Sequence, residues 1–201
     1  MLSSIAFLPT APVLIPDLAQ AAAPETDGIR EATDAILASL ISTNCLPVIV
    51  GDDLGHEVGR YLLSRVTDTN PILIELPANA TQAQQLAVVQ RIQDISDGSL
   101  PVVVIAMGDA SACRSPQAPG HEHPSAVMFD DAVLAALSRV DLLALKELDQ
   151  DLASQLLVAG RSVWPTMAEL LQADNRTWVS TPFSTADPYG VLYLVGAWTT
   201  D

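Results

Sequence analysis

The sequence is poor in basic residues and has no long apolar run, and both shortages exclude classes of protein. Nine Lys and Arg residues stand against 24 Asp and Glu, which gives a formal net charge of −15. Most of the surface should therefore repel phosphate backbones and anionic membrane surfaces, so we expect neither nucleic acid nor a membrane as a partner. No apolar run approaches the roughly 20 residues that span a bilayer. Prolines interrupt the first apolar residues, which argues against a signal peptide.

Cysteine is also scarce, and several common catalytic motifs are missing. Cys45 and Cys113 are far apart in the sequence and show no CxxC spacing. This pattern is typical of proteins in a reducing compartment, so we predict a cytoplasmic protein with two free thiols. The chain contains no GxSxG elbow, no Walker-type phosphate loop and no GxGxxG after a strand. Hydrolase, nucleotidase and dinucleotide-binding functions therefore have no motif support.

Three histidines limit the metal chemistry that the chain can support. His56 follows "GDD" in a segment of helical period, whereas His121 and His123 flank Glu122 in the loop "APGHEHPS". A metal site needs three or more ligands that converge from oriented positions, and an HxH pair in a loop is more typical of a solvated loop. We therefore predict no metal at the His121 and His123 pair.

The apolar residues predict alternating strands and helices. Short β-branched runs follow Pro47, Pro71 and Pro101, and continuous runs of this kind are typical of strands buried on both faces. Segments with helical period lie between them, and Thr81 is the expected N-cap of one. The alternation predicts a single α/β domain over residues 1–201, with a mainly parallel central sheet flanked by helices on both faces.

The second half of the chain is predicted to be mainly helical before it closes with strands. Helices are expected over residues 125–140, 149–159 and 164–172, the last with Pro165 in its first turn. The runs "RTWVSTP" and "YGVLYLVGAW" are predicted to be closing strands. The mean hydropathy of +0.31 is consistent either with a helix face buried in a homo-oligomer or with an Ala- and Leu-rich core.

Small polar and acidic residues follow the predicted strands, at the edge where ligands bind in parallel sheets. One simple interpretation is that such Asp and Ser residues only cap helices or close turns. The long polar loop "GDASACRSPQAPG" has neither helical nor strand period, and loops of that length are often functional. We therefore expect one cleft at this edge, and its candidate residues are Thr10, Asp52, Asp53, His56, Asp109, Ser111 and Arg114.

Three segments together resemble a known family. The opening "AFLPTAPVLIPDLA", the loop "GDASACRSPQAPG" followed by "FDDAVLAAL", and the closing "PYGVLYLVGAW" resemble the LigB-like superfamily of class III extradiol ring-cleavage dioxygenases, which includes the Memo proteins. The resemblance implies an α/β fold. In active members it also implies a non-haem Fe(II) held by two histidines and a carboxylate, with positions left open for a catechol-like substrate and oxygen.

The chain departs from that family at two ligand positions. Where relatives have "LPH" this sequence has Thr10, and where they have "GD-x-SH" it has Ala112. A neutral hydroxyl is a weak ligand for Fe(II), and a methyl group is none. His56 is a candidate for the remaining family histidine, although its alignment is open. The form "GD-x-SA-x-R" is similar to that of a short, degenerate subgroup of the superfamily.

These departures leave two hypotheses. In the first, the protein has lost the iron site and ring cleavage, carries no metal cofactor, and binds a small molecule or a partner in the residual cleft. In the second, it is an active metal-dependent dioxygenase, with Fe(II) held by substitute ligands. The candidates for those ligands are His56, Asp52, Asp109, His121 and His123.

Overall fold

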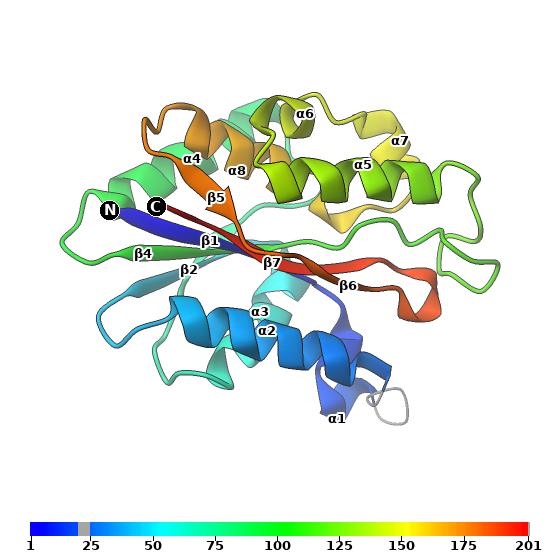
Figure 1. Cartoon of the computed structure of the whole chain (residues 1–201), viewed down its shortest axis with the longest axis horizontal. Coiled ribbons are helices and arrows are strands. Elements are labelled where there is room, and N and C mark those ends of the chain that lie inside the picture. Colours follow the sequence, from blue (N-terminus) through cyan, green and yellow to red (C-terminus); the bar gives the residue numbers. More distant parts are fainter. Residues whose placement is uncertain (20–24, 201) are drawn as a thin grey trace.

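The computed structural model describes residues 1–19 and 25–200, and it places a sheet between two layers of helices (Figure 1). Within these residues, the strands lie in the order β3-β2-β4-β1-β7-β5, and β6 pairs with β7. Their bounds are β1 Leu2–Leu8, β2 Leu46–Gly51, β3 Ile72–Glu75, β4 Val102–Met107, β5 Trp178–Ser180, β6 Ser184–Ala186 and β7 Tyr193–Thr200.

The sheet is mixed, which corrects the prediction of a mainly parallel one. The half formed by β3, β2, β4 and β1 is parallel, whereas β7 runs antiparallel to β1 and pairs in the same sense with β5 and β6. The parallel strands are joined by helical crossovers, which parallel neighbours require. Strands β6 and β7 follow one another through a short connection without a long helix, and such a connection produces an antiparallel pair.

Helices cover both faces of the sheet in Figure 1, with α1, α2 and α3 on one side and α4 to α8 on the other. The predicted helix over residues 125–140 corresponds to α5, and the one over 164–172 to α8. The bounds are α1 Pro16–Ala19, α2 Asp27–Leu40, α3 Asp53–Ser64, α4 Gln82–Ser96, α5 Ala126–Arg139, α6 Leu142–Lys146, α7 Gln150–Gln155 and α8 Val163–Gln172, with short 3-10 turns η1 Pro12–Leu14, η3 Ala159–Arg161 and η4 Pro188–Gly190.

Local sequence explains where two of these helices begin. Thr81 accepts a hydrogen bond from the Gln84 N–H while the Gln84 side chain accepts one from the Thr81 N–H, and this capping box confirms the predicted N-cap. Asp52 caps α3 by accepting from the Gly55 N–H at 2.8 Å. Strands β3 and β4 begin directly after Pro71 and Pro101 as predicted. Strand β2 begins earlier than predicted, at Leu46, so that Pro47 lies near its start, where a missing N–H is tolerated.

Apolar side chains fill both faces of the sheet. On the face under α4 to α8, the Phe7 ring lies edge-on to Trp198, with 4.6 Å between ring centroids, and the Trp198 indole N–H donates to the Leu137 carbonyl at 2.7 Å. On the other face, Leu8 and Leu37 are completely buried between the sheet and α2 and α3. Burying each leucine fully is worth roughly 1.5–3 kcal/mol relative to leaving it exposed.

Two glycines allow the loop after β4 to pack closely against η3. A Cβ atom on Gly108 would lie 2.5 Å from the Gly160 Cα, and one on Gly160 would lie 2.3 Å from the Trp164 indole. The Gly160 N–H donates to the Asp109 carbonyl at 3.0 Å across this contact. The absence of both side chains therefore allows the backbone next to Asp109 to pack directly against η3.

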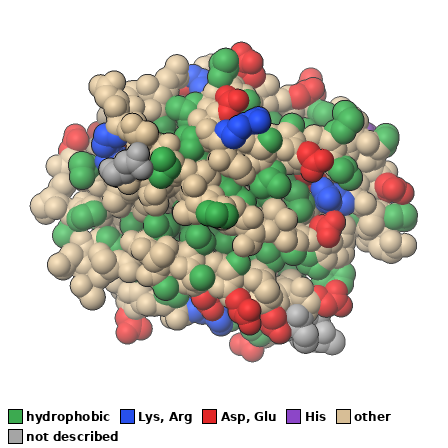
Figure 2. Space-filling view, viewed as in Figure 1, with side chains coloured by type: hydrophobic (Ala, Val, Ile, Leu, Met, Phe, Trp, Pro, Cys, Tyr) green, Lys and Arg blue, Asp and Glu red, His purple; other side chains and the backbone are tan. Residues whose placement is uncertain are grey.

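Acidic side chains dominate the charged surface, and Figure 2 shows them dispersed over one face of the molecule with few Lys or Arg among them. No described helix is long and apolar enough to cross a membrane. The two cysteines are buried free thiols, as predicted.

Candidate functional site

The carboxyl ends of β1 and β4 lie at the point where the chain path divides. After β1 the chain continues to α1 and α2 on one face of the sheet, and after the neighbouring β4 it continues to α5 on the other (Figure 1). In open α/β sheets, ligands bind at such a topological switch point. Thr10 and Asp109 are the second residues after these two strands, so the fold places both there.

Thr10 and Asp109 form a paired hydrogen bond across the switch point. The Thr10 backbone N–H donates to Asp109 Oδ1 at 3.0 Å, and the Thr10 hydroxyl donates to Oδ2 at 2.6 Å. Thr10 is 5% exposed and Asp109 is 8% exposed. Each carboxylate oxygen of Asp109 therefore has a donor from the same residue, and the pair is nearly closed to solvent.

Burial raises the pKa of the Asp109 carboxyl to about 6, and the nearby Asp52 carboxylate adds to the increase. The two hydrogen bonds from Thr10 act in the opposite direction because they favour the charged form. Burial, together with the Asp109 charge, also raises the pKa of the Tyr193 phenol. Asp109 is thus influenced by the Asp52 charge and itself influences Tyr193, an arrangement that is typical of functional sites as well as of buried ion networks.

Ser111 and Arg114 bond to a different carboxylate. The Ser111 N–H donates to Asp130 Oδ1 at 2.9 Å and its hydroxyl to Oδ2 at 2.6 Å, while the Arg114 guanidinium donates to Oδ2 at 2.9 Å. Ser111 and Asp130 are completely buried, and Arg114 also reaches the exposed Asp187 at 3.1 Å. This group repeats the geometry of the Thr10–Asp109 pair and fastens the loop to α5.

A third group lies at the carboxyl end of β3. His56 Nε2 is 3.1 Å from the Ile74 carbonyl oxygen, and Nδ1 is 3.7 Å from Glu75 Oε2. One ligand atom from each of Asp53, His56 and Glu75 lies within 4.8 Å of the other two. The imidazole is 12% exposed, whereas both carboxylates are exposed.

The remaining histidines belong to no such group among the described residues. His123 Nδ1 accepts a hydrogen bond from the Ser125 N–H at 3.2 Å, next to the start of α5. His121 occupies a left-handed turn with a φ of 57°. The expectation that this pair holds no metal stays a prediction.

The predicted site residues thus fall into separate groups: Thr10 with Asp109 and the nearby Asp52; Ser111 with Arg114; and Asp53 with His56. That all seven line one cleft stays a prediction. Sequence reasoning missed Asp130, Glu75 and Tyr193. The sequence pattern could have identified Asp130, because it is an acidic residue on the apolar face of the predicted helix over 125–140, where a buried charge needs a partner.

Among known proteins, no protein-family model matches the chain, and no curated protein matches it.

Proposed function

We propose that the protein is a LigB-like binding protein that has lost iron-dependent ring cleavage and binds a small molecule or a partner in the residual cleft at the switch point. The observation that carries this proposal is the Thr10–Asp109 pair. At the position of a family histidine stands Thr10, whose neutral hydroxyl is a weak metal ligand and already donates a hydrogen bond to Asp109. Both oxygens of the Asp109 carboxylate are already engaged by Thr10.

The second family position fits iron no better. Ala112 has no donor atom in its side chain, its N–H donates to the Leu156 carbonyl at 3.0 Å, and its own carbonyl accepts from the Gly120 N–H at 2.9 Å. The residues present therefore do not fit an iron centre of two histidines and a carboxylate. They support no chemical step through iron at this place.

Binding is supported by what the switch point retains. It keeps a carboxyl group whose pKa is near 6 and a tyrosine, Tyr193, whose phenol is influenced by that charge. A polar ligand would have to replace the Thr10 hydroxyl at Asp109 Oδ2, and a protonatable carboxyl can then accept a hydrogen bond from it or donate one to it.

Metal content and oxygen uptake test this proposal. We expect protein purified without a tag and treated with a chelator to contain no stoichiometric iron, zinc or manganese. We also expect no oxygen uptake with catechol or protocatechuate when ferrous iron is supplied. Near-stoichiometric iron together with opening of a catechol ring contradicts the proposal.

We propose as a second candidate function a metal-dependent activity centred on His56, which the Asp53, His56 and Glu75 group favours. If Nε2 donates to the Ile74 carbonyl, the lone pair of Nδ1 faces the two carboxylates, and a backbone partner of this kind commonly orients metal-ligating histidines. Titration with Mn²⁺ or Zn²⁺ tests it: His56→Gln should abolish binding and His121→Gln should not. Equal binding by both variants contradicts this candidate.

We also propose that the protein is a homo-oligomer and that it is located in the cytoplasm. Size-exclusion chromatography with light scattering tests the first, and a monomer at all concentrations contradicts it.

A further inference from the structure

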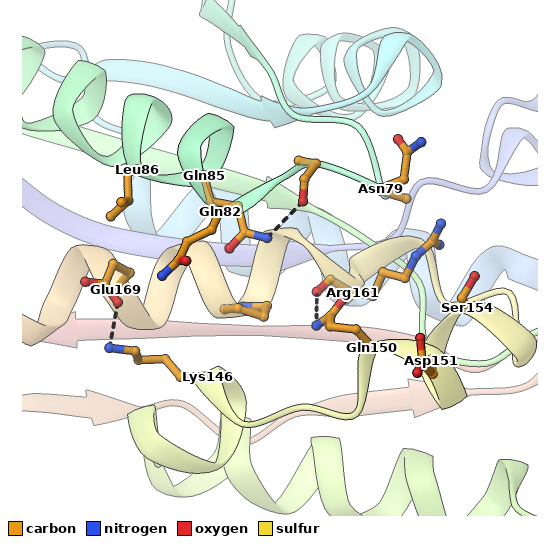
Figure 3. Close-up of a pocket in the computed structure, with 13 residues that line it drawn as sticks. Asn79, Gln82, Gln85, Leu86, Lys146, Gln150, Asp151, Ser154, Arg161 and Glu169 are labelled. Carbon is orange, nitrogen blue, oxygen red and sulfur yellow. Dashed lines mark hydrogen bonds and ion pairs between the residues drawn. The ribbon is translucent and has the colours of Figure 1, made fainter.

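A polar groove of about 510 Å³ lies away from the switch point, on the helical face formed by α4 and α6 to α8 (Figure 3). Small-molecule sites typically have volumes of roughly 300–1,000 Å³. None of the seven site residues that the sequence predicted lines this groove. The groove is therefore a separate place in the fold, and its capacity to bind a ligand does not depend on the family resemblance.

Hydrogen bonds between the walls hold the groove in shape. The Ser162 hydroxyl donates to the Ala78 carbonyl at 2.5 Å, which joins the segment before α8 to the loop before α4. The Gln150 amide donates to the Arg161 carbonyl at 3.0 Å, and Figure 3 shows this bond along one wall. The groove is thus built by contacts between segments far apart in the sequence.

Several polar side chains along the groove have no protein partner. Within the described residues, the side chains of Asn79, Gln82 and Ser154 make no hydrogen bond, although all three line the groove. Two carboxamides and a hydroxyl offer both donors and acceptors. Such groups suit the hydroxyl, carbonyl or amide groups of a ligand.

Arg161 is the unusual charge in this groove. Its guanidinium donates to the Val158 carbonyl at 2.7 Å, and no carboxylate of a described residue lies within ion-pair distance of it. The described arginines that also lack a carboxylate partner, Arg60, Arg91 and Arg139, are exposed, whereas Arg161 is partly buried. Burial lowers the pKa of the Arg161 guanidinium because it disfavours the charged form.

The other charges along the groove are compensated or exposed. Lys146 Nζ lies 2.6 Å from Glu169 Oε2, and Figure 3 shows this pair at one end, with Arg161, Asn79 and Ser154 toward the other. Asp151 also lines the groove, but it is exposed and forms no ion pair with Arg161. Among the described residues that line the groove, Arg161 is therefore the cation without a carboxylate partner, and the exposed Asp151 lines the groove with it.

We propose that this groove binds a small monocarboxylic acid that also carries hydroxyl or amide groups. The carboxylate would pair with the planar guanidinium of Arg161, which can donate to both oxygens at once. The remaining polar groups of the ligand would lie along Asn79, Gln82 and Ser154. A phosphate dianion fits less well, because one guanidinium leaves a charge uncompensated near Asp151 in a chain of net charge −15.

Titration of isotope-labelled protein followed by amide NMR tests the proposal with defined probes. Lactate, gluconate and quinate are the monocarboxylates; sorbitol, the neutral polyol of the same length as gluconate, and inorganic phosphate are the comparisons. We expect at least one monocarboxylate to cause saturable shifts at the amides of Asn79, Gln82, Ser154 and Arg161. Sorbitol should bind at least about tenfold more weakly, because it lacks the charge-assisted hydrogen bonds.

Variants separate the role of Arg161 from general charge effects. Arg161→Gln should weaken monocarboxylate binding by roughly 10- to 100-fold, whereas Arg60→Gln, which removes an exposed arginine outside the groove, should leave it unchanged. If the spectrum of Arg161→Gln shows that this variant does not fold, Asn79→Ala is measured instead. This variant keeps Arg161 and should still weaken monocarboxylate binding.

Four results overturn the proposal. They are no saturable shift at the groove with any of the three acids, binding of phosphate in preference to all of them, equal affinity for sorbitol and for the acid that binds most tightly, and equal weakening by Arg60→Gln and Arg161→Gln. None of these results bears on metal content or oxygen uptake, so this proposal and the proposed function fail independently.

Discussion

The Thr10 hydroxyl lies 2.6 Å from Asp109 Oδ2, and this short hydrogen bond joins the carboxyl ends of two neighbouring parallel strands. The Gly108 N–H extends the strand pairing by donating to the Leu8 carbonyl at 2.8 Å, directly before the two side chains meet. The switch point of the sheet is therefore closed by a single polar pair. The chemistry available there depends on the protonation of Asp109.

Asp109 should make the protein less stable as the pH rises from about 4 to about 6. Its pKa is raised from 3.8 in a free carboxyl to about 6 in the folded protein, so the folded state binds more protons than the unfolded state in this window. About two pKa units correspond to roughly 3 kcal/mol, fully lost above pH 6. We expect Asp109→Asn to be more stable than the natural protein by about 1–3 kcal/mol at pH 7 and nearly equal at pH 4.

Denaturant unfolding of both proteins at a series of pH values measures this difference. An Asn side chain can still accept from the Thr10 N–H, and its amide can donate to the Thr10 hydroxyl. A difference between the two proteins that does not change from pH 4 to pH 7 contradicts the raised pKa.

Thr10→Val should raise the pKa of Asp109 further. The variant keeps the shape of the side chain but removes the hydroxyl that donates to the ionised carboxylate. It should also lower the free energy of unfolding at pH 7 by about 1.5–3 kcal/mol, the value of a hydrogen bond to a charged group. Carboxyl-carbon NMR titration measures the pKa, and Thr10→Ser, which restores a hydroxyl, is the control. An unchanged pKa in Thr10→Val would show that the hydroxyl does not stabilise the charge.

Asp130 should contribute far more to stability than Asp187, although both bond to Arg114. Asp130 is completely buried and also accepts from the Ser111 N–H and hydroxyl, whereas the side chain of Asp187 is 56% exposed. Asp130→Ala leaves a guanidinium and the Ser111 donors without partners, at a cost of about 3–5 kcal/mol. Asp187→Ala should cost less than about 1 kcal/mol. Chemical unfolding of both variants measures this, and equal losses would contradict the structural role assigned to Asp130.

Gly160→Ala should destabilise the loop that carries Asp109. A methyl group there meets the Trp164 indole, and overpacking of this kind costs about 1–3 kcal/mol. Gly28→Ala is the matched control, because nothing lies within 4 Å of a Cβ at Gly28 in the first turn of α2. That control should be neutral or stabilising by up to about 1 kcal/mol. Thermal unfolding compares the two, and a Gly160→Ala protein as stable as Gly28→Ala would show that Trp164 can move aside.

Local features of the fold were predictable because a few neighbouring residues determine them. The Thr81 capping box needs only Thr81 and Gln84, and strands β3 and β4 are indicated by the β-branched runs after Pro71 and Pro101. The direction of β7 was not predictable in this way, because it depends on which strand it pairs with. The run from Leu142 to Lys146 was too short for a helical period to be recognised, and it forms α6.

The sequence indicates which polar residues follow the strands, but not which of them bond to one another. Asp109 and Ser111 are two residues apart, so in an extended segment they point to the same side, which suggests a shared environment. Instead, Asp109 bonds to Thr10 and Ser111 to Asp130. Contacts of this kind depend on how the loop turns between α5 and the ends of the sheet, and a sequence pattern carries no information about that path.

Placing histidines at residues 10 and 112 is a direct test of the proposed relation to the LigB-like superfamily. If the cleft geometry is inherited, Thr10→His with Ala112→His should bind Fe(II) at least about tenfold more tightly than the natural protein, measured by anaerobic equilibrium dialysis. Each single variant supplies one imidazole and should bind more weakly than the pair.

The changes should cost about 1–3 kcal/mol in stability, because Thr10 is nearly buried and a Cβ at Gly55 would lie 3.5 Å from its methyl group. An amide NMR spectrum must therefore show that the double variant is folded. A folded double variant with the iron affinity of the natural protein means that residues 10 and 112 do not converge on one site. The resemblance in the three sequence segments would then reflect the fold of the strand ends and not an ancestral iron centre.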